Sequence, residues 1–127
     1  AQKNNVEYCG FNELLERSDI VSIHLSLSDE TNELLDSNAL EKMKSTAILI
    51  NSSRGECVNE AALKKALDEK RIAGAGLDVY LEEPYKGCLL ECDNVITTPH
   101  IGSYAREIRI KMEMEAAENL IIGLTNE

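Results

Sequence analysis

The sequence predicts an α/β fold: a doubly wound parallel sheet with helices on both faces, in three αβα layers. The first observation is that short apolar runs of strand length alternate with stretches of helical periodicity. The second is that three of the apolar runs end in polar residues. Because ligands bind outside the carboxyl ends of parallel strands, these polar residues are expected to gather at one edge of the sheet. The runs are Ala47–Ile50 before Asn51-Ser52-Ser53-Arg54-Gly55, Ala73–Leu77 before Asp78, and Val95–Thr98 before Pro99-His100.

The chain before the first of these runs predicts a strand, a helix and a second strand. Val6–Cys9 is expected to form a short strand. Asn12 is a suitable cap for a helix over Glu13–Arg17, with both leucines of that helix facing inward. Asp19–Leu25 is rich in β-branched residues and predicts a stronger strand.

A polar loop and a broken helix are expected to follow that strand. Ser26–Thr31 forms the loop at its carboxyl end. The apolar spacing over Leu34–Met43 predicts helix, with a break near Asp36-Ser37 and Ser37 as the cap of the second half. Ala47–Ile50 is then a fully apolar strand, as a sheet covered on both faces requires.

The next helix and strand have clear signals at both ends. Asn59 is expected to cap a helix over Glu60–Lys70. Ala73-Gly74-Ala75-Gly76 is unusual for a strand, because glycine weakens strands, and we expect a helix or a cofactor to approach its backbone closely. The apolar face of the helix consists of Ala62, Leu63, Ala66 and Leu67.

The C-terminal part predicts a loop, a last strand and a long helix. The loop begins at Glu82-Glu83-Pro84 and reaches Asp93, and the strand covers Asn94–Thr98. Ser103 is expected to cap a helix over Tyr104–Ile122, which Gly123 ends. Its apolar stripe includes Ile108, Met112, Ala116 and Leu120.

Length, charge and cysteine content exclude several classes of protein. The chain of 127 residues suits one domain, and its net charge of -10 argues against nucleic acid and anionic membranes as partners. No apolar run approaches the ~18 residues of a membrane span, and no signal peptide opens the chain, so a cytoplasmic location is expected. Of four cysteines only Cys88 and Cys92 lie close together, which is poor metal spacing, so we predict reduced thiols and no metal site.

Three polar residues at the expected edge form a chemical set: Arg54, Glu83 and His100. Each alone has an ordinary interpretation, as a surface arginine, a loop glutamate or an exposed histidine. Together they offer more, because a carboxylate fixes the tautomer of an imidazole and makes it a proton shuttle, while a guanidinium binds a carboxylate with two hydrogen bonds. This set suits redox chemistry at the carbon next to a carboxylate.

Other residues at that edge have two interpretations each. His24 lies in an apolar run and is either core or packing at the edge of a cofactor. Asp78 is a turn carboxylate or an acceptor for a carboxamide. Ser52-Ser53 satisfy loop backbone groups or donate to a ribose or phosphate. Gly102-Ser103 open a helix, whose N-terminus suits an anionic group.

Four segments in order give the chain a resemblance to a known family. They read SDIVSIHLSLSDET, MKSTAILINSSRGECVNEAAL, IAGAGLDVYLEEP and NVITTPHIGS, and with the chain between them they cover nearly everything from about Leu15 onward. The chain resembles the nucleotide-binding, Rossmann-like domain of the D-isomer-specific 2-hydroxyacid dehydrogenases, which include D-3-phosphoglycerate, D-lactate and glyoxylate/hydroxypyruvate enzymes. Several linked motifs make this a specific match.

The resemblance implies a role for individual residues. Arg54 matches the substrate-binding arginine, Glu83 the glutamate that orients the histidine, and His100 the acid/base. Asp78 matches the residue that holds the nicotinamide carboxamide. The implied cofactor contacts are Leu25, Ser26, Thr31, Ser52, Ser53, Arg54, Asp78, His100, Gly102 and Ser103, and the implied cofactor is NAD, with NADP not excluded.

The chain departs from the family pattern in ways that bear on function. Ser26 stands where the family usually has proline, and the GxGxxG turn and its acidic partner are absent. Residues 1–127 are therefore expected to be a partial nucleotide-binding domain that also lacks the substrate lobe. We expect the intact protein to be a homodimeric oxidoreductase acting on a small 2-hydroxy or 2-oxo acid, and the chain alone to be inactive. The alternative is an NAD(H)-sensing binding module of the corepressor type.

Overall fold

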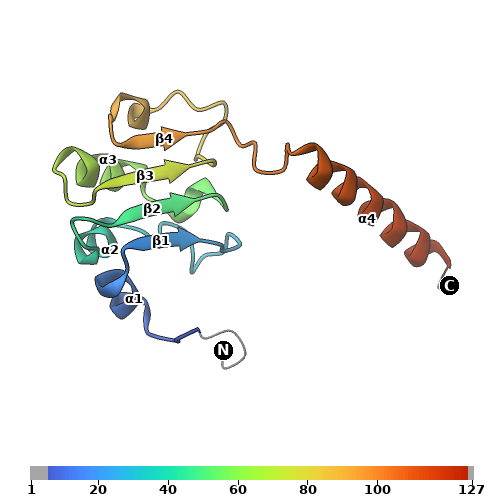
Figure 1. Cartoon of the computed structure of the whole chain (residues 1–127), viewed down its shortest axis with the longest axis horizontal. Helices are drawn as coiled ribbons and strands as arrows, with labels where there is room; N and C mark the ends of the chain where they lie inside the picture. Colours follow the sequence, from blue (N-terminus) through green and yellow to red (C-terminus); the bar gives the residue numbers. More distant parts are fainter. Residues whose placement is uncertain (1–5, 126–127) are drawn as a thin grey trace.

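Four parallel strands form one sheet in the order β1-β2-β3-β4 (Figure 1). The computed structural model describes residues 6–125. The register aligns Ile20 with Ile48 and Gly74, so equivalent ends of the strands lie side by side. The parallel α/β arrangement predicted from the sequence is confirmed. The strands are β1 (Ile20–Ile23), β2 (Ile48–Asn51), β3 (Gly74–Leu77) and β4 (Val95–Thr97).

Three α-helices pack together beside this sheet, and a fourth projects away from it (Figure 1). The contacts of α2 with both α1 and α3 place the first three in one layer. All residues of α4 are exposed, including the stripe predicted to be apolar. The helices are α1 (Phe11–Arg17), α2 (Ser37–Lys42), α3 (Glu60–Asp68) and α4 (Arg106–Thr125), with short 3₁₀ turns η1 (Gly55–Cys57) and η2 (Cys88–Glu91).

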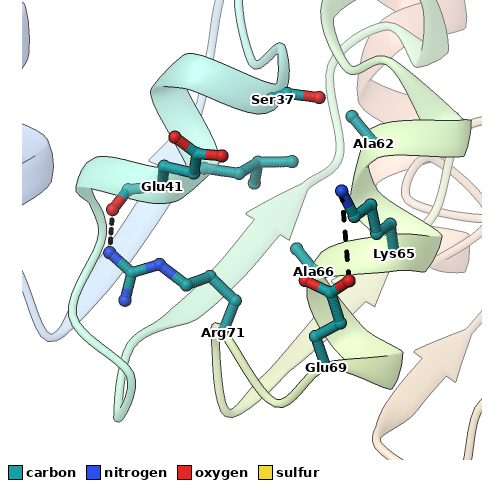
Figure 2. Close-up of a pocket in the computed structure, with 8 residues that line it drawn as sticks. Ser37, Glu41, Ala62, Lys65, Ala66, Glu69 and Arg71 are labelled. Atoms are coloured by element: carbon teal, nitrogen blue, oxygen red, sulfur yellow. Dashed lines mark hydrogen bonds and ion pairs between the residues drawn. The ribbon is translucent and has the colours of Figure 1, made fainter.

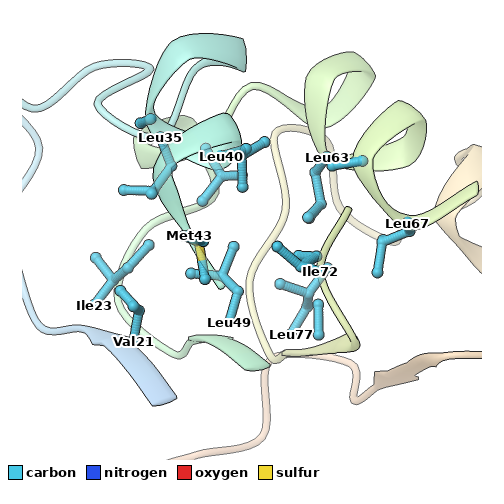
Figure 3. Packing of buried hydrophobic residues seen from close by; sticks show 14 of the residues in the cluster. Val21, Ile23, Leu35, Leu40, Met43, Leu49, Leu63, Leu67, Ile72 and Leu77 are labelled. Carbon is cyan, nitrogen blue, oxygen red and sulfur yellow. The ribbon is translucent and has the colours of Figure 1, made fainter. Parts of the chain in front are cut away.

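The core lies between that helical layer and the sheet (Figure 3). Leu49 in the strand β2, Leu40 in α2 and Leu63 in α3 are at most 1% exposed. Burying such a side chain contributes about 1.5–3 kcal/mol. Asn59 caps α3, since its side chain accepts a hydrogen bond from the amide of Ala62, as predicted. Core packing thus holds β2 and α3 in place, and so positions the segment that connects them.

The opposite face of the sheet is open in the part of the chain that the structure describes. Ile20, Ile48 and Ile96 point to that face and are 63%, 41% and 75% exposed. The expected helices are therefore found on one face, as in an incomplete doubly wound sheet. A parallel sheet is normally covered on both faces, so the exposure of these three isoleucines departs from the usual pattern.

Several local predictions in the N-terminal half were wrong in detail. Val6–Cys9 forms no strand. The helix α1 begins at Phe11 after Gly10, so Asn12 lies inside it, and Leu14 is 38% exposed. The cap of α2 is Asp36, whose carboxylate accepts a hydrogen bond from the amide of Ala39, and not Ser37.

The region before α2 is extended, because it pairs with a distant segment. The residues Leu34 and Leu35 precede the helix and do not belong to it. Leu35 forms an isolated parallel bridge with Val58. This long-range pairing overrides the local helical spacing that the sequence shows.

The glycine strand and the last helix also differ from expectation. A Cβ at Gly74 would lie 2.7 Å from the backbone oxygen of Asn94, and one at Gly76 would lie 3.1 Å from the side chain of Ile50. Among the described residues, the close approach is therefore to the neighbouring strand β2 and to the residue before β4, and not to a helix. The helix α4 begins at Arg106 and not at Tyr104, so Ser103 does not cap it, and it continues through Gly123 to Thr125, so glycine does not end it.

Candidate active site

His100 and Glu83 form a pair at the carboxyl ends of β3 and β4. The imidazole Nδ1 lies 2.9 Å from Oε2 and 3.1 Å from Oε1 of Glu83. His100 follows β4 by three residues, and Glu83 lies in the loop after β3. Both side chains are partly exposed, at 50% and 38%. Nδ1 is engaged by the carboxylate, so Nε2 is the nitrogen directed to a reacting group.

The backbone of His100 is left-handed, with φ 54°. This conformation is unfavourable for a residue with a side chain and needs surrounding contacts to hold it. Asp78 supplies three of them. Its Oδ1 accepts hydrogen bonds from Thr98 Oγ1 at 2.6 Å and from the Ile101 amide at 2.9 Å, and its Oδ2 accepts one from the Gly102 amide at 2.9 Å.

The charge state of Asp78 follows from these contacts. Burial on its own would raise the pKa of this carboxyl group. The hydrogen bonds from Thr98, Ile101 and Gly102 outweigh burial and lower the pKa below its usual range. Asp78 therefore remains an anion that holds the loop on both sides of His100. Its expected contact with a carboxamide stays a prediction.

Arg54 follows β2 and is held in a turn organised by Asn51. The Asn51 side chain is 1% exposed. Its Nδ2 donates to the Arg54 carbonyl at 2.8 Å, and its Oδ1 accepts from the amide and hydroxyl of Ser53, both at 3.1 Å. The guanidinium of Arg54 is exposed and donates to the Ser53 carbonyl at 2.6 Å.

One cavity brings the three predicted catalytic residues together. Its volume is about 270 Å³, and Arg54, Glu83 and His100 all line it. Gly55 and Tyr80 form part of its wall. Arg54 and the His100–Glu83 pair thus line one cavity, so residues 54, 83 and 100 lie at one edge of the sheet, as the sequence predicted.

Gly55 allows this arrangement, because a side chain there would collide with the next strand's loop. A Cβ at Gly55 would lie 2.1 Å from the carbonyl carbon of Tyr80 and 2.6 Å from the amide nitrogen of Leu81. We expect Gly55→Ala to lower the free energy of unfolding by about 3 kcal/mol or more, since backbone cannot move aside cheaply. Urea denaturation measures the change.

Gly123→Ala is the matched control for that substitution. A Cβ at Gly123 meets nothing within 4 Å, and the residue lies inside α4. Alanine there should be neutral or stabilising by up to about 1 kcal/mol. An equal response of the two variants would contradict the close approach of Gly55 to Tyr80.

A second cavity contains part of the predicted cofactor-binding set. It has a volume of about 520 Å³, lies beside the carboxyl ends of β1 and β2, and shares Arg54 with the first cavity. Its lining residues are His24, Leu25, Ser26, Leu27, Ser53 and Arg54. His24 is exposed just beyond β1, with Nε2 2.8 Å from Ser22 Oγ, so its interpretation as a core residue was wrong.

Thr31, Ser52, Gly102 and Ser103, which were also predicted to contact the cofactor, line neither of these cavities. Thr31 closes the loop after β1, since its Oγ1 donates to the Ser26 carbonyl and accepts from the Ser28 amide, both at 2.8 Å. Ser52 and Ser103 are exposed. The backbone amide of Gly102 donates its hydrogen bond to the Asp78 carboxylate. The binding roles of these residues remain predictions.

Two structural contributors to the site were not singled out from the sequence. Asn51 organises the arginine turn, and its signal is a polar residue that ends an otherwise apolar strand. Tyr80 is 6% exposed, and its hydroxyl lies within hydrogen-bonding distance of the carbonyls of Leu77 and Thr98. No spacing in the sequence indicates these two contacts.

A groove between α2 and α3 lies apart from the predicted site residues (Figure 2). Its volume is about 320 Å³. Its two basic residues have partners: the Arg71 guanidinium donates to the Glu41 carbonyl, and the Lys65 ammonium lies 3.9 Å from the Glu69 carboxylate.

The described residues 6–125 contain no group of three or more histidine, cysteine or acidic side chains placed to hold a metal ion. The four cysteines are free thiols, and Cys57 is fully buried. Burial raises the pKa of the Cys57 thiol. Among the same residues, no helix has the length and apolar character needed to span a membrane.

The parallel sheet and the polar cluster at its carboxyl edge define a nucleotide-binding type of α/β domain. Residues 1–102 match the model of the family described as "D-isomer specific 2-hydroxyacid dehydrogenase, NAD binding domain". The chain belongs to this family, as the resemblance of its motifs implied.

Relatives and solved structures agree with this assignment. The chain is 48% identical over 118 residues to a glyoxylate reductase of Korarchaeum cryptofilum, covering 91% of this chain and 36% of the relative. It is 44% identical over 128 residues to a glyoxylate/hydroxypyruvate reductase B of Pectobacterium carotovorum, covering 99% of this chain and 40% of the relative. The chain thus spans about two fifths of the length of these relatives.

The structure of a glyoxylate reductase from Paecilomyes thermophila superposes with a TM-score of 0.90 at 35% identity, covering 94% of this chain and 37% of that one. An NAD-complexed D-isomer-specific 2-hydroxyacid dehydrogenase from Lactobacillus delbrueckii gives a TM-score of 0.80 at 33% identity, covering 94% of this chain and 41% of that one. These neighbours confirm the Rossmann-like fold.

Proposed function

We propose that this chain is part of an NAD(P)-dependent oxidoreductase that interconverts D-2-hydroxy acids and 2-oxo acids. The observation that carries the proposal is the His100–Glu83 pair at 2.9 Å, in one cavity with Arg54. Membership of the 2-hydroxyacid dehydrogenase family supports it. Residues 1–127 then belong to the nucleotide-binding domain of a longer protein.

His100 moves the proton in this mechanism. Glu83 accepts the hydrogen bond of Nδ1–H, which fixes the tautomer and the orientation of the ring. In the reducing direction, Nε2–H of the imidazolium donates its proton to the carbonyl oxygen of the 2-oxo acid. In the oxidising direction, neutral Nε2 accepts the proton of the 2-hydroxyl group.

Arg54 binds and orients the substrate. Its exposed guanidinium can form two parallel hydrogen bonds with the carboxylate of the acid. The carbon to be reduced is next to that carboxylate, so this grip places its oxygen towards His100 in the shared cavity. Orientation by a fixed cation also favours the 2-oxo or 2-hydroxy acid over a simple ketone or alcohol.

The residues at the second cavity fit one part of a dinucleotide. The space of about 520 Å³ beside β1 and β2 opens next to Arg54. The Ser26 hydroxyl can donate to a ribose or phosphate oxygen, while the Ser53 hydroxyl, which donates to Asn51, can accept from a ribose hydroxyl. When bound, a nicotinamide cofactor supplies or accepts the hydride. The chain lacks a GxGxxG turn, so the pyrophosphate must be held by other parts of the longer protein.

The enzyme interpretation is preferred over a corepressor-type module. The relatives named above are reductases or a dehydrogenase, and none supports the corepressor alternative. Because glyoxylate and hydroxypyruvate reductases are among them, small 2-oxo acids are the substrates to test first. The homodimer and the cytoplasmic location expected from the sequence remain predictions for the longer protein.

Steady-state assays of the longer protein test the proposal. Reduction of glyoxylate, hydroxypyruvate and pyruvate with NADH or NADPH is followed at the absorbance of the reduced nicotinamide, with oxidation of D- and L-lactate as a stereochemical check. We expect turnover of at least one 2-oxo acid and preference for the D-hydroxy acid. Tight cofactor binding without turnover of any acid would favour the binding module instead.

A further inference from the structure

We propose that Tyr80 is a positioning residue that keeps His100 and Glu83 aligned with each other. Its hydroxyl acts on the backbone beside His100, and its backbone amide acts on the Glu83 carboxylate. This deepens the proposed function and rests on the assignment of His100 and Glu83 as the acid/base pair. Tyr80 lies outside the cofactor-binding and catalytic sets described above. It is 6% exposed and forms part of the wall of the cavity that Arg54 and His100 share.

The hydroxyl of Tyr80 connects the ends of β3 and β4. It lies 2.8 Å from the Leu77 carbonyl and 2.9 Å from the Thr98 carbonyl, so its single proton is shared between two acceptors. Thr98 donates its own amide to Leu77 at 2.9 Å. The phenol therefore links the end of β3 to the end of β4, at the point where β4 leads into the loop that carries His100.

The Thr98 carbonyl also accepts a hydrogen bond from the amide of His100, at 3.0 Å. Tyr80 and His100 thus donate to the same oxygen. His100 has a left-handed backbone, whose cost must be offset by fixed neighbours. By fixing the Thr98 carbonyl, the phenol fixes the acceptor on which this backbone turn depends.

The backbone of Tyr80 holds the other member of the pair. Its amide donates to Glu83 Oε1 at 3.3 Å, while the same carboxylate contacts His100 Nδ1. The contacts form a closed ring, from the Tyr80 amide through Glu83 and the imidazole to the His100 backbone, and through Thr98 back to the Tyr80 hydroxyl. Loss of the hydroxyl opens this ring at one point only.

Tyr85 provides a matched comparison, because its ring stacks on that of Tyr80 with centroids 4.2 Å apart. Its hydroxyl points to other partners, accepting a hydrogen bond from the Leu89 amide and lying 3.2 Å from Glu60 Oε2. Burial raises the pKa of Tyr85 to about 12 and raises that of Tyr80 as well, so both phenols are neutral donors at neutral pH. Of these two hydroxyl groups, that of Tyr80 contacts the Thr98 carbonyl, whereas that of Tyr85 contacts Glu60 and Leu89.

The test is the tautomer of His100, measured by ¹⁵N NMR of the imidazole in this chain at a pH where the ring is neutral. In the wild-type chain, Glu83 should hold the Nδ1–H form. Tyr80→Phe should lower the ratio of Nδ1–H to Nε2–H by about two- to tenfold, the range that one net hydrogen bond spans. Tyr85→Phe should leave the ratio unchanged while removing the same atom from the same stack.

A second measurement needs no substitution. In the wild-type chain the hydroxyl proton of Tyr80 should exchange slowly with water and show a cross-relaxation signal to the Thr98–His100 segment. An unchanged tautomer ratio in Tyr80→Phe, an equal loss in Tyr85→Phe, or a fast-exchanging Tyr80 hydroxyl would overturn the proposal. None of these readouts uses substrate, cofactor or turnover. Failure of the positioning role of Tyr80 can therefore be distinguished from failure of the proposed enzymatic function.

Discussion

His100→Asn should reduce kcat of the longer protein by about 10²- to 10⁴-fold, the range that general acid/base catalysis contributes. Asparagine can still donate a hydrogen bond towards Glu83, so the loop and the fold should persist. It cannot transfer a proton at Nε2, because it has no titratable group. Steady-state kinetics give kcat, and the unfolding transition shows whether stability is kept.

Glu83→Gln separates orientation from proton transfer. Glutamine has the same shape as the glutamate that lies 2.9 Å from Nδ1, but it offers a neutral amide in place of the carboxylate acceptor that orients the ring. We expect kcat to fall less than in His100→Asn. Glu82→Gln is the matched control, since Glu82 is exposed and next to Glu83 in the loop, and it should keep full turnover. Full turnover in His100→Asn would remove His100 from the mechanism.

The order of the elements could be read from the sequence because it depends on local signals. Asn59 before α3 and the apolar run of β2 are such signals, and both were confirmed. Where a distant partner decides the conformation, local spacing failed. Leu35 pairs with Val58 instead of continuing a helix, and α4 passes through Gly123 because no turn requires the chain to stop there.

The gathering of the site could also be predicted, since parallel strands bring their carboxyl ends to one edge whatever lies between them in sequence. That rule placed Arg54, Glu83 and His100 around one cavity. It could not show the left-handed turn at His100 or the shared acceptor at Thr98. Those features depend on differences of a few tenths of an ångström in the positions of backbone atoms, which residue types alone do not specify.

Arg54→Ala should lower kcat/KM for a 2-oxo acid by about 10²- to 10³-fold, because it leaves the carboxylate of the substrate without its cation. Arg54→Lys keeps the charge but loses the two-pronged geometry, so we expect an intermediate value. Arg71→Lys is the matched control, since Arg71 lies in the groove between α2 and α3. It should keep kcat/KM within about twofold, on the ordinary behaviour of remote surface substitutions.

The double variant shows whether the two residues act on one bound molecule. Arg54 and His100 line one cavity, and each contacts a different end of the same short acid in the proposed mechanism. If the carboxylate grip places the oxygen against Nε2, removing the grip also removes most of the benefit of the imidazole. His100→Asn in the Arg54→Ala background should therefore cost much less than in the wild-type protein. Strict additivity of the two losses would mean that the arginine binds the acid without aligning it for proton transfer.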